Sequence, residues 1–128
     1  MLYHPERLER VHPDIARVFA EAGKTWDIQI LEGLRTLERQ KEMVAQGKSK
    51  TLASKHLAQP DGFGHAVDYA KFPVDWKDTN GFYFLGGYLL GVADTLGIKL
   101  RFGGDWDGDR DLHDQTFMDL DHVEVPNA

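Results

Sequence analysis

The chain has 128 residues, of which 41% are hydrophobic and 28% charged, and its formal net charge is -6 at pH 7. This composition is ordinary for one globular domain and argues against disordered and membrane-spanning classes. A nucleic-acid partner is not expected, because phosphate contacts need a clustered basic surface and the balance here is acidic.

The sequence lacks targeting segments and cysteine, which limits the expected cellular location of the protein and the chemistry of its site. Residues 1–7 lack the basic and apolar regions of a signal peptide, and no apolar run approaches membrane-spanning length. We therefore expect a protein that starts in the cytoplasm and does not insert into a membrane. The chain has no cysteine, which leaves His, Asp and Glu as strong metal ligands and removes thiol nucleophiles and disulfides.

The first half of the chain predicts a helix, a strand and a second helix. A proline in the first turn, a glycine at the end and an apolar stripe predict a helix over 13–22. Alternation and β-branched residues predict a strand over 26–33. Thr36 is a plausible cap for a helix over 37–46, which Gly47 would end.

The second half predicts three strands and one long helix. Alternating patterns indicate strands over 66–72, 98–102 and 118–125, and an apolar face indicates a helix over 81–96. The connections vary in type, which favours an α+β fold with a mainly antiparallel sheet and packed helices over a regular parallel α/β sheet. Residues 1–128 are expected to form a single domain.

Two histidine-bearing segments stand far apart in the chain, at 54–68 and 118–125. His56, Asp68 and His122 match the three ligands that a hydrolytic zinc site takes, with a fourth position left for water. The chain has six histidines, so chance triplets are common. From the residues alone, a metal site and a set of structural histidines are equally open.

Three ordered motifs resemble the signature of zinc peptidases related to D-alanyl-D-alanine carboxypeptidases. They are Ser54-x-His56, Gly64-x-Ala66-x-Asp68 and Asp119-x-x-His122-x-Glu124. The chain is more closely similar to phage endolysins of the L-alanyl-D-glutamate endopeptidase type, over roughly residues 10–125. Supporting pieces are the runs 32–36 and 102–106 and Gln40.

The resemblance implies a hedgehog/D,D-peptidase-like fold and one catalytic zinc ion. By that resemblance His56, Asp68 and His122 bind the ion, and Asp119 is the carboxylate that takes a proton from the attacking water. It further implies that Arg35 anchors or polarises the substrate. From the sequence alone, a surface ion pair is the alternative for this arginine.

Three other residues are expected to support the site or contact the substrate. Ser54 would hold the site by a hydrogen bond, although a simple loop serine is an equal alternative. Glu124 is expected to be a partner of the ligands. Trp106 is the best tryptophan candidate for the wall of the cleft.

The spacing of the first two ligands departs from the family pattern. The family usually separates its first histidine and its aspartate by seven residues, whereas His56 and Asp68 are twelve apart. We interpret the difference as a loop insertion within 57–63, which costs little free energy when its ends are fixed. His65 then competes as a ligand. On a regular strand, however, it would face away from Asp68.

The alternation of side chains between the two faces of a strand also bears on the proposed base. Asp119 and His122 are three apart, so on an ideal strand they would point to opposite faces, while Glu124 would share the face of His122. Either the strand begins after Asp119 or Glu124 is the base. The resemblance favours Asp119.

Aspartates alternate in the segment before the last strand, at Asp105, Asp107, Asp109 and Asp111. They resemble a calcium-binding loop, but the glycine and glutamate positions do not match the helix-loop-helix type. A regulatory Ca²⁺ site and a solvated acidic turn are both open.

The expected function is zinc-dependent hydrolysis of the L-Ala to D-Glu amide in peptidoglycan stem peptides. The protein would be a monomer that waits in the host cytoplasm until the membrane is breached and then lyses the wall. One alternative is a D,D- or L,D-carboxypeptidase acting on the same stem. Another is a non-catalytic, zinc-stabilised module that binds the cell wall.

Overall fold

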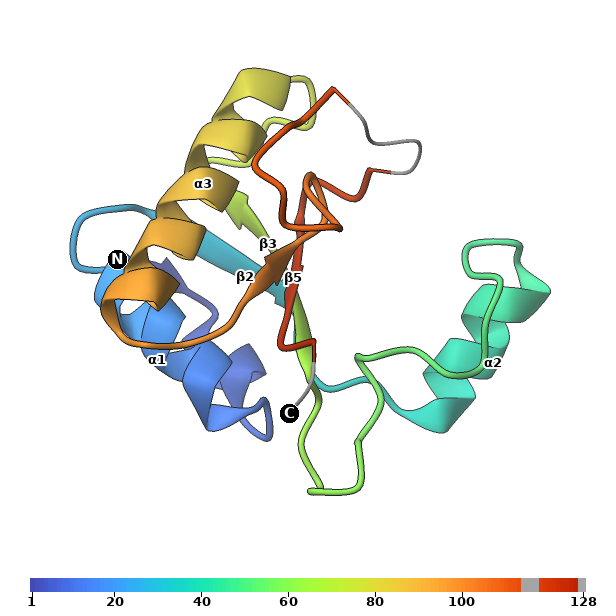
Figure 1. Ribbon diagram of the computed structural model, residues 1–128. Helices are drawn as coiled ribbons and strands as arrows, with labels where there is room; N and C mark the ends of the chain where they lie inside the picture. Colours follow the sequence, from blue (N-terminus) through green and yellow to red (C-terminus); the bar gives the residue numbers. More distant parts are fainter. Residues whose placement is uncertain (114–117, 127–128) are drawn as a thin grey trace.

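The computed structural model describes residues 1–113 and 118–126 as helices packed beside one sheet (Figure 1). In chain order the elements are β1 (Leu2–Tyr3), η1 (Pro5–Leu8), α1 (Pro13–Ala22), β2 (Ile28–Glu32), α2 (Leu37–Ala45), β3 (Ala66–Lys71), α3 (Thr79–Thr95), β4 (Arg101–Phe102) and β5 (His122–Glu124). The expected α+β class is confirmed. No helix in these two ranges is long and apolar enough to cross a membrane.

The sheet has five strands in the order β1-β2-β3-β5-β4. β1 runs parallel to β2, and every other neighbouring pair is antiparallel, as the mainly antiparallel expectation required. Central strand β3 pairs Asp68 with Glu32 on one side and with His122 on the other. The sheet thereby joins two chain segments that are far apart in the sequence.

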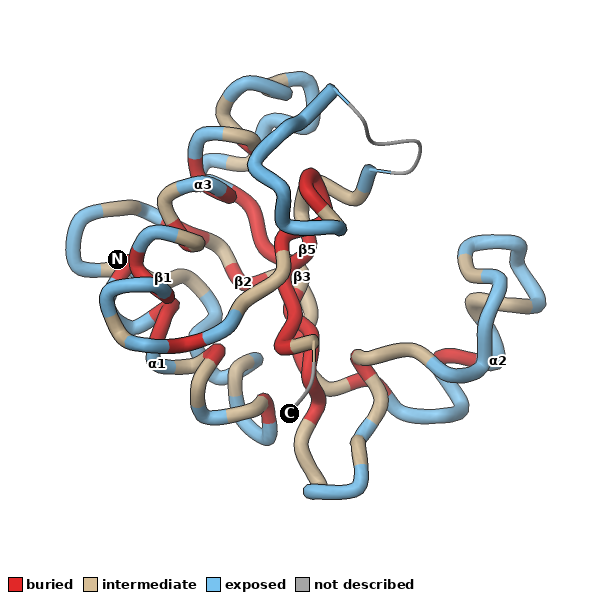
Figure 2. The backbone as a smooth tube through the Cα atoms, viewed as in Figure 1, coloured by how far each residue is buried: buried red, intermediate tan, exposed pale blue. Residues whose placement is uncertain are grey.

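Helices α1 and α3 pack against each other beside the sheet, while α2 stands apart from them (Figure 1). Figure 2 shows that most of the buried residues lie in the central strands and on the inner sides of α1 and α3. Phe19 of α1, Tyr69 of β3 and Leu89 of α3 are fully buried there. Each such side chain contributes about 1.5–3 kcal/mol of burial free energy. This core supports the strands that carry the site.

The helix ends follow the local signals. The side chain of His12 accepts a hydrogen bond from Asp14 N, and Thr36 Oγ1 accepts one from Arg39 N, so both helices begin on a side-chain cap. Helix α2 has one buried residue, Gln40, because its partners are loops rather than the sheet.

The sequence-based expectation was wrong at the edges of the sheet. β1 and η1 were not expected, and β4 covers two residues of the expected 98–102. The last strand begins at His122 instead of 118, because Asp119 N donates to Gly103 O at 2.9 Å. A Cβ on Gly103 would lie 2.0 Å from Asp119 O, so only glycine permits this approach.

Candidate functional site

The three expected ligands meet on the sheet although they come from separate segments. His56 follows the loop after α2, Asp68 lies on β3, and His122 opens β5. Asp68 Oδ1 is 3.2 Å from His56 Nε2 and 3.2 Å from His122 Nδ1. Both histidines are buried, so the three donor atoms converge in a place with little solvent.

These separations fit a bound metal ion. Two ligand atoms at about 2.1 Å from a tetrahedral zinc ion stand roughly 3.4 Å apart, close to the distances found here. His56 Nδ1 lies 3.0 Å from Gly33 O, which can only accept, so the proton of the neutral ring is on Nδ1. His56 Nε2 then turns a lone pair toward the Asp68 carboxylate, an arrangement that favours a cation between them.

The charges around His122 also favour a cation. Burial alone would raise the pKa of Asp68, but hydrogen bonds with His122 and His56 outweigh it and hold that pKa far below its ordinary value. Burial alone would lower the pKa of His122, whereas hydrogen bonds with Asp68 and Glu124 raise it to about 9. A metal ligand must be a neutral imidazole, so a bound cation replaces this proton between the same carboxylates.

Arg35 is a buried residue of the site, so the alternative of a surface ion pair is wrong. Its Nε donates to Glu32 Oε1 at 2.6 Å, and its Nη1 donates to Gln40 Oε1 at 2.7 Å. Its Nη2 also contacts Glu32 and lies 3.9 Å from Asp68 Oδ2. The guanidinium is therefore held in one orientation beside the Asp68 carboxylate.

Gln40 supports the family resemblance in the sequence, but the contact it makes at the site is known only from the structure. It is fully buried, accepts from Arg35, and donates through Nε2 to Ser49 Oγ at 2.9 Å and to Thr51 O at 2.6 Å. It thus ties Arg35 to the loop that follows α2. A glutamine in a mostly polar helix carries no sequence signal for such a bridge.

Asp119 and Glu124 are placed very differently. Asp119 lies on the loop before β5, borders the cleft, and has Oδ2 3.8 Å from His122 Nδ1. Glu124 is buried, with one oxygen 2.9 Å from His122 Nε2 and the other accepting from Arg101 Nη2 at 2.7 Å. Because β5 starts after Asp119, this residue is not on the strand, and the argument that it must face away from His122 does not apply.

Asp121 is a neighbour that sequence reasoning missed. Burial and then a hydrogen bond with Asp119 raise the pKa of Asp121 to about 8. Carboxylate oxygens of Asp68, Asp119 and Asp121 lie within 4.8 Å of one another. Asp121 therefore keeps its proton near neutral pH, and the neighbouring carboxylates of Asp68 and Asp119 carry negative charge that a cation would offset.

A cavity of about 510 Å³ opens onto these residues. Its lining comprises the three expected ligands, Arg35, Asp119, Ser54, Met43 of α2, and residues of the loop after α2, namely Gly47, Lys48, Ser49, Lys50 and Thr51. Ser54 Oγ accepts from His56 N at 3.1 Å, so the hydroxyl shapes the turn that presents this histidine.

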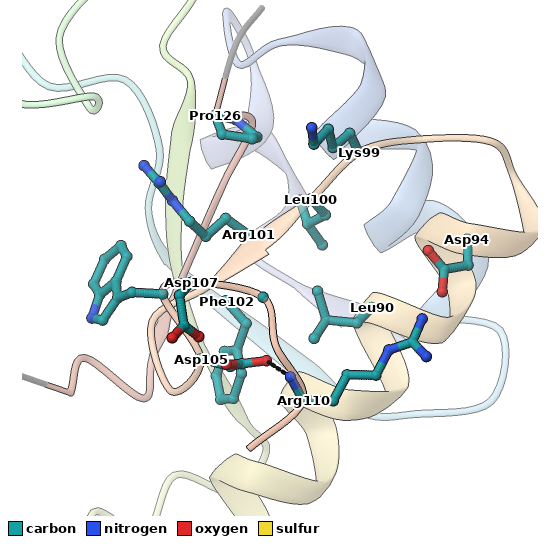
Figure 3. A pocket seen from close by; sticks show the side chains of 12 residues that line it. Leu90, Asp94, Lys99, Leu100, Arg101, Phe102, Asp105, Asp107, Arg110 and Pro126 are labelled. Carbon is teal, nitrogen blue, oxygen red and sulfur yellow. Dashed lines mark hydrogen bonds between the residues drawn. The ribbon is translucent and has the colours of Figure 1, made fainter. Parts of the chain in front are cut away.

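Trp106 does not line this cavity, contrary to expectation. Its ring packs against His122 at 5.5 Å between centroids and borders a second cavity of about 320 Å³. Figure 3 shows that cavity, with Arg101 beside it. The guanidinium of Arg101 lies 5.7 Å from the Trp106 ring centre, so the tryptophan lies between Arg101 and His122 and contacts both.

Three of the four expected calcium-loop aspartates come together beside this second cavity. Oxygens of Asp105, Asp107 and Asp109 lie within 4.8 Å of one another, and Asp111 is outside the group. Asp105 is buried, and its Oδ2 accepts from Arg110 N at 2.9 Å (Figure 3).

His65 lies apart from the cleft. It is buried, and its Nε2 is 2.8 Å from Asp61 Oδ2 in the expected insertion. His65 belongs to a different group of donors from the one formed by His56, Asp68 and His122.

Known proteins are similar to this chain over nearly its whole length. A family model described as phage L-alanyl-D-glutamate peptidase matches residues 4–125. The L-alanyl-D-glutamate peptidase of Escherichia phage T5 is 31% identical over 131 residues, covering 94% of this chain and 92% of that protein. The solved L-Ala D-Glu endopeptidase ChiX of Serratia marcescens has a TM-score of 0.78 at 31% identity, covering 98% of this chain and 90% of that one. The resemblance drawn from the three motifs is confirmed.

Proposed function

This chain belongs to the family of phage L-alanyl-D-glutamate peptidases, and we propose that it hydrolyses the L-Ala to D-Glu amide of peptidoglycan stem peptides. The observation that carries the proposal is the convergence of His56, Asp68 and His122 on one cleft with Asp119 and Arg35. All these groups come from a single chain, which supports a monomeric catalytic domain.

The same donor set supports a single zinc ion as the cofactor. Two imidazoles and one carboxylate match the ligands of hydrolytic zinc sites, and their spacing fits. When bound there, zinc would lower the pKa of water and polarise the scissile carbonyl. Glu124 and Gly33 O would orient the two histidines through their second ring nitrogens.

Asp119 is proposed to move the proton during hydrolysis. Its carboxylate borders the cleft on a loop, whereas both oxygens of Glu124 already have partners. Asp119 would accept the proton of the attacking water and donate it to the leaving amine. A positioned acid-base group contributes a factor of roughly 10² to 10⁴ in rate.

Arg35 is proposed to hold the substrate beside the scissile bond. Glu32 and Gln40 fix its guanidinium in advance, which limits the entropy that binding would cost. Lys48 and Lys50 add positive charge to the same cleft, although the chain as a whole is acidic. These cations lie in the cleft beside the acidic donor group, and they suit a stem peptide that carries free carboxylates.

The test is a digest of purified muropeptides analysed by mass spectrometry. We expect fragments that begin with D-Glu, and none from the matched Asp119→Asn variant. Release of a terminal residue alone would instead establish a D,D- or L,D-carboxypeptidase. Binding to the wall without any product would establish a non-catalytic, zinc-stabilised module.

A regulatory calcium ion is proposed at Asp105, Asp107 and Asp109. The buried Asp105 Oδ1 has no hydrogen-bond partner within residues 1–113 and 118–126, and the adjacent Trp106 contacts the ligand His122. Calcium titration of zinc-loaded protein, followed by calorimetry and activity, tests the proposal. Absence of both heat and an activity change at millimolar calcium would contradict it.

Membership of a phage peptidase family also supports a role in host lysis. We propose that the protein stays in the host cytoplasm until the membrane is breached and then acts on the wall. Fractionation of infected cells before and after lysis onset tests this, since early recovery outside the membrane would contradict it.

A further inference from the structure

A second group of metal-type donors lies outside the catalytic cleft. It comprises His12 at the cap of α1, Asp61 in the expected insertion and His65 just before β3. One ligand atom of each lies within 4.8 Å of the other two. His65 Nε2 is 2.8 Å from Asp61 Oδ2, and the rings of His12 and His65 meet edge-on with centroids 5.2 Å apart.

We propose that His12, Asp61 and His65 bind a second divalent transition-metal ion of the zinc class. Two imidazoles and one carboxylate suit such an ion, and water can supply the remaining ligand. Ligand atoms around a tetrahedral zinc ion stand roughly 3.4 Å apart, so the group needs only small shifts to hold one.

The second group shares no residue with the catalytic one. His56, Asp68 and His122 form the catalytic set, and each of these is absent from the second set. His65 precedes β3 whereas Asp68 lies on it, and their side chains belong to the two separate donor groups. Binding at one group therefore does not require occupation of the other.

His65 provides a rigid anchor for this site. Its amide donates to Lys55 O at 2.8 Å, its carbonyl accepts from Val125 N at 3.0 Å, and its side chain is 1% exposed. Its Nδ1 is buried and lacks a hydrogen-bond partner in the part of the chain that the structure describes. The carboxylate of Asp61 is 37% exposed, so an ion can enter from the solvent side.

His12 provides a spectroscopic marker of binding. Its Nδ1 accepts from Asp14 N at 3.1 Å, so the ring proton of the neutral form is on Nε2. Binding through Nε2 requires the ring to change tautomer, so that its one proton sits on Nδ1, from which it can donate a hydrogen bond to Asp14 Oδ2 once the present 3.9 Å separation closes. The Asp14 amide then loses its acceptor, and no proton leaves the ring.

The site would fasten the insertion to the rest of the domain. Asp61 sits in the loop that begins directly after His56, and His12 and His65 belong to the scaffold. That loop extends below the sheet and lies near the start of α1 (Figure 1). An ion bound only by the folded state stabilises that state by an amount that grows with the logarithm of the ratio of free ion to the dissociation constant.

Zinc stoichiometry tests the proposal. After dialysis against buffered free zinc, the wild-type protein should hold two ions, and Asp61→Asn and His12→Asn one each. Asparagine at 12 can still cap α1, and asparagine at 61 can still accept from Phe63 N, so both variants should fold. His122→Ala should also hold one, and the Asp61→Asn/His122→Ala double variant none.

The exposed His4→Ala variant is the matched control and should retain two ions. One ion in the wild-type protein, or two in Asp61→Asn, would overturn the proposal. Nitrogen-15 spectra of the imidazoles give an independent reading, because the second equivalent of zinc should shift His12 Nε2 and speed exchange of the Asp14 amide. A second equivalent that leaves both signals unchanged would place the ion elsewhere and also overturn it.

Discussion

Asp68 and His122 are cross-strand neighbours on β3 and β5, with Asp68 Oδ1 3.2 Å from His122 Nδ1. The pairing places both side chains on the same face of the sheet, beside His56 from a third segment. A slip of one residue would turn one of them to the opposite face. The site therefore depends on the register between β3 and β5. Substitutions can separate the roles of the individual residues at the site.

Asp119→Asn should remove turnover while leaving the metal in place. Asparagine keeps the size of the side chain but is not a base, so we expect a loss of about 10² to 10⁴ in rate. Zinc content should stay that of the wild-type protein, because Asp119 is not among the three proposed ligands. Exposed Asp75→Asn is the matched control. Wild-type hydrolysis by the Asp119 variant would contradict the assignment.

Glu124→Gln should act on the metal rather than on the proton transfer. Glu124 holds His122 through Nε2, and loss of such a partner typically lowers metal affinity by about 10- to 100-fold. Competition with a zinc indicator measures the affinity, and turnover is measured at saturating zinc. If turnover collapsed with the affinity unchanged, Glu124 would be the base in place of Asp119.

Gln40→Met should weaken both the fold and substrate binding. The change leaves the donors of Arg35 and the acceptor of Thr51 without their buried partner, which costs about 1–3 kcal/mol of unfolding free energy. Arg35 would also lose its fixed orientation, so KM should rise more than kcat falls. Gln46→Met on the exposed end of α2 is the control. Equal denaturation midpoints and equal KM values for the two variants would contradict the role of Gln40 as a bridge between Arg35 and the loop after α2.

Metal removal should stop hydrolysis and lower the melting temperature. A chelator withdraws the ion that binds the folded state, so the stabilisation linked to it is lost. Returning zinc to the dialysed protein should restore both readings, whereas magnesium, which prefers oxygen ligands, should not. Activity that persists at exhaustive chelation would rule out the metal mechanism.

Two neighbouring glycines of α3 should respond in opposite directions to alanine. A Cβ on Gly86 would lie 2.4 Å from the Phe102 ring, so Gly86→Ala should destabilise by about 1–3 kcal/mol through overpacking. A Cβ on Gly87 meets nothing within 4 Å, so Gly87→Ala should stabilise by up to about 1 kcal/mol through helix propensity. Urea denaturation of both variants checks the pair. Stabilisation by Gly86→Ala would show that the contact of α3 with Phe102 is loose, and destabilisation by Gly87→Ala would contradict the open space at that position.

The sequence by itself determined the three helices, because their caps and apolar spacings are local signals. It also determined the donor residues that meet at the cleft, since the spaced motifs around His56, Asp68 and His122 are a matter of residue order. From the sequence, the insertion within 57–63 could be recognised, and so could the two candidates for the base, Asp119 and Glu124. Local periodicity could not decide between these two carboxylates.

Only the tertiary structure decided where the last strand begins and which residues support the site. The start of β5 depends on the Asp119 contact with Gly103, and the Gln40 bridge depends on a loop folding back over α2. The meeting of His12 with Asp61 and His65 likewise needs three separate segments to pack together. These are long-range contacts, and a pattern that repeats every two or four residues carries no information about which distant residue will lie opposite.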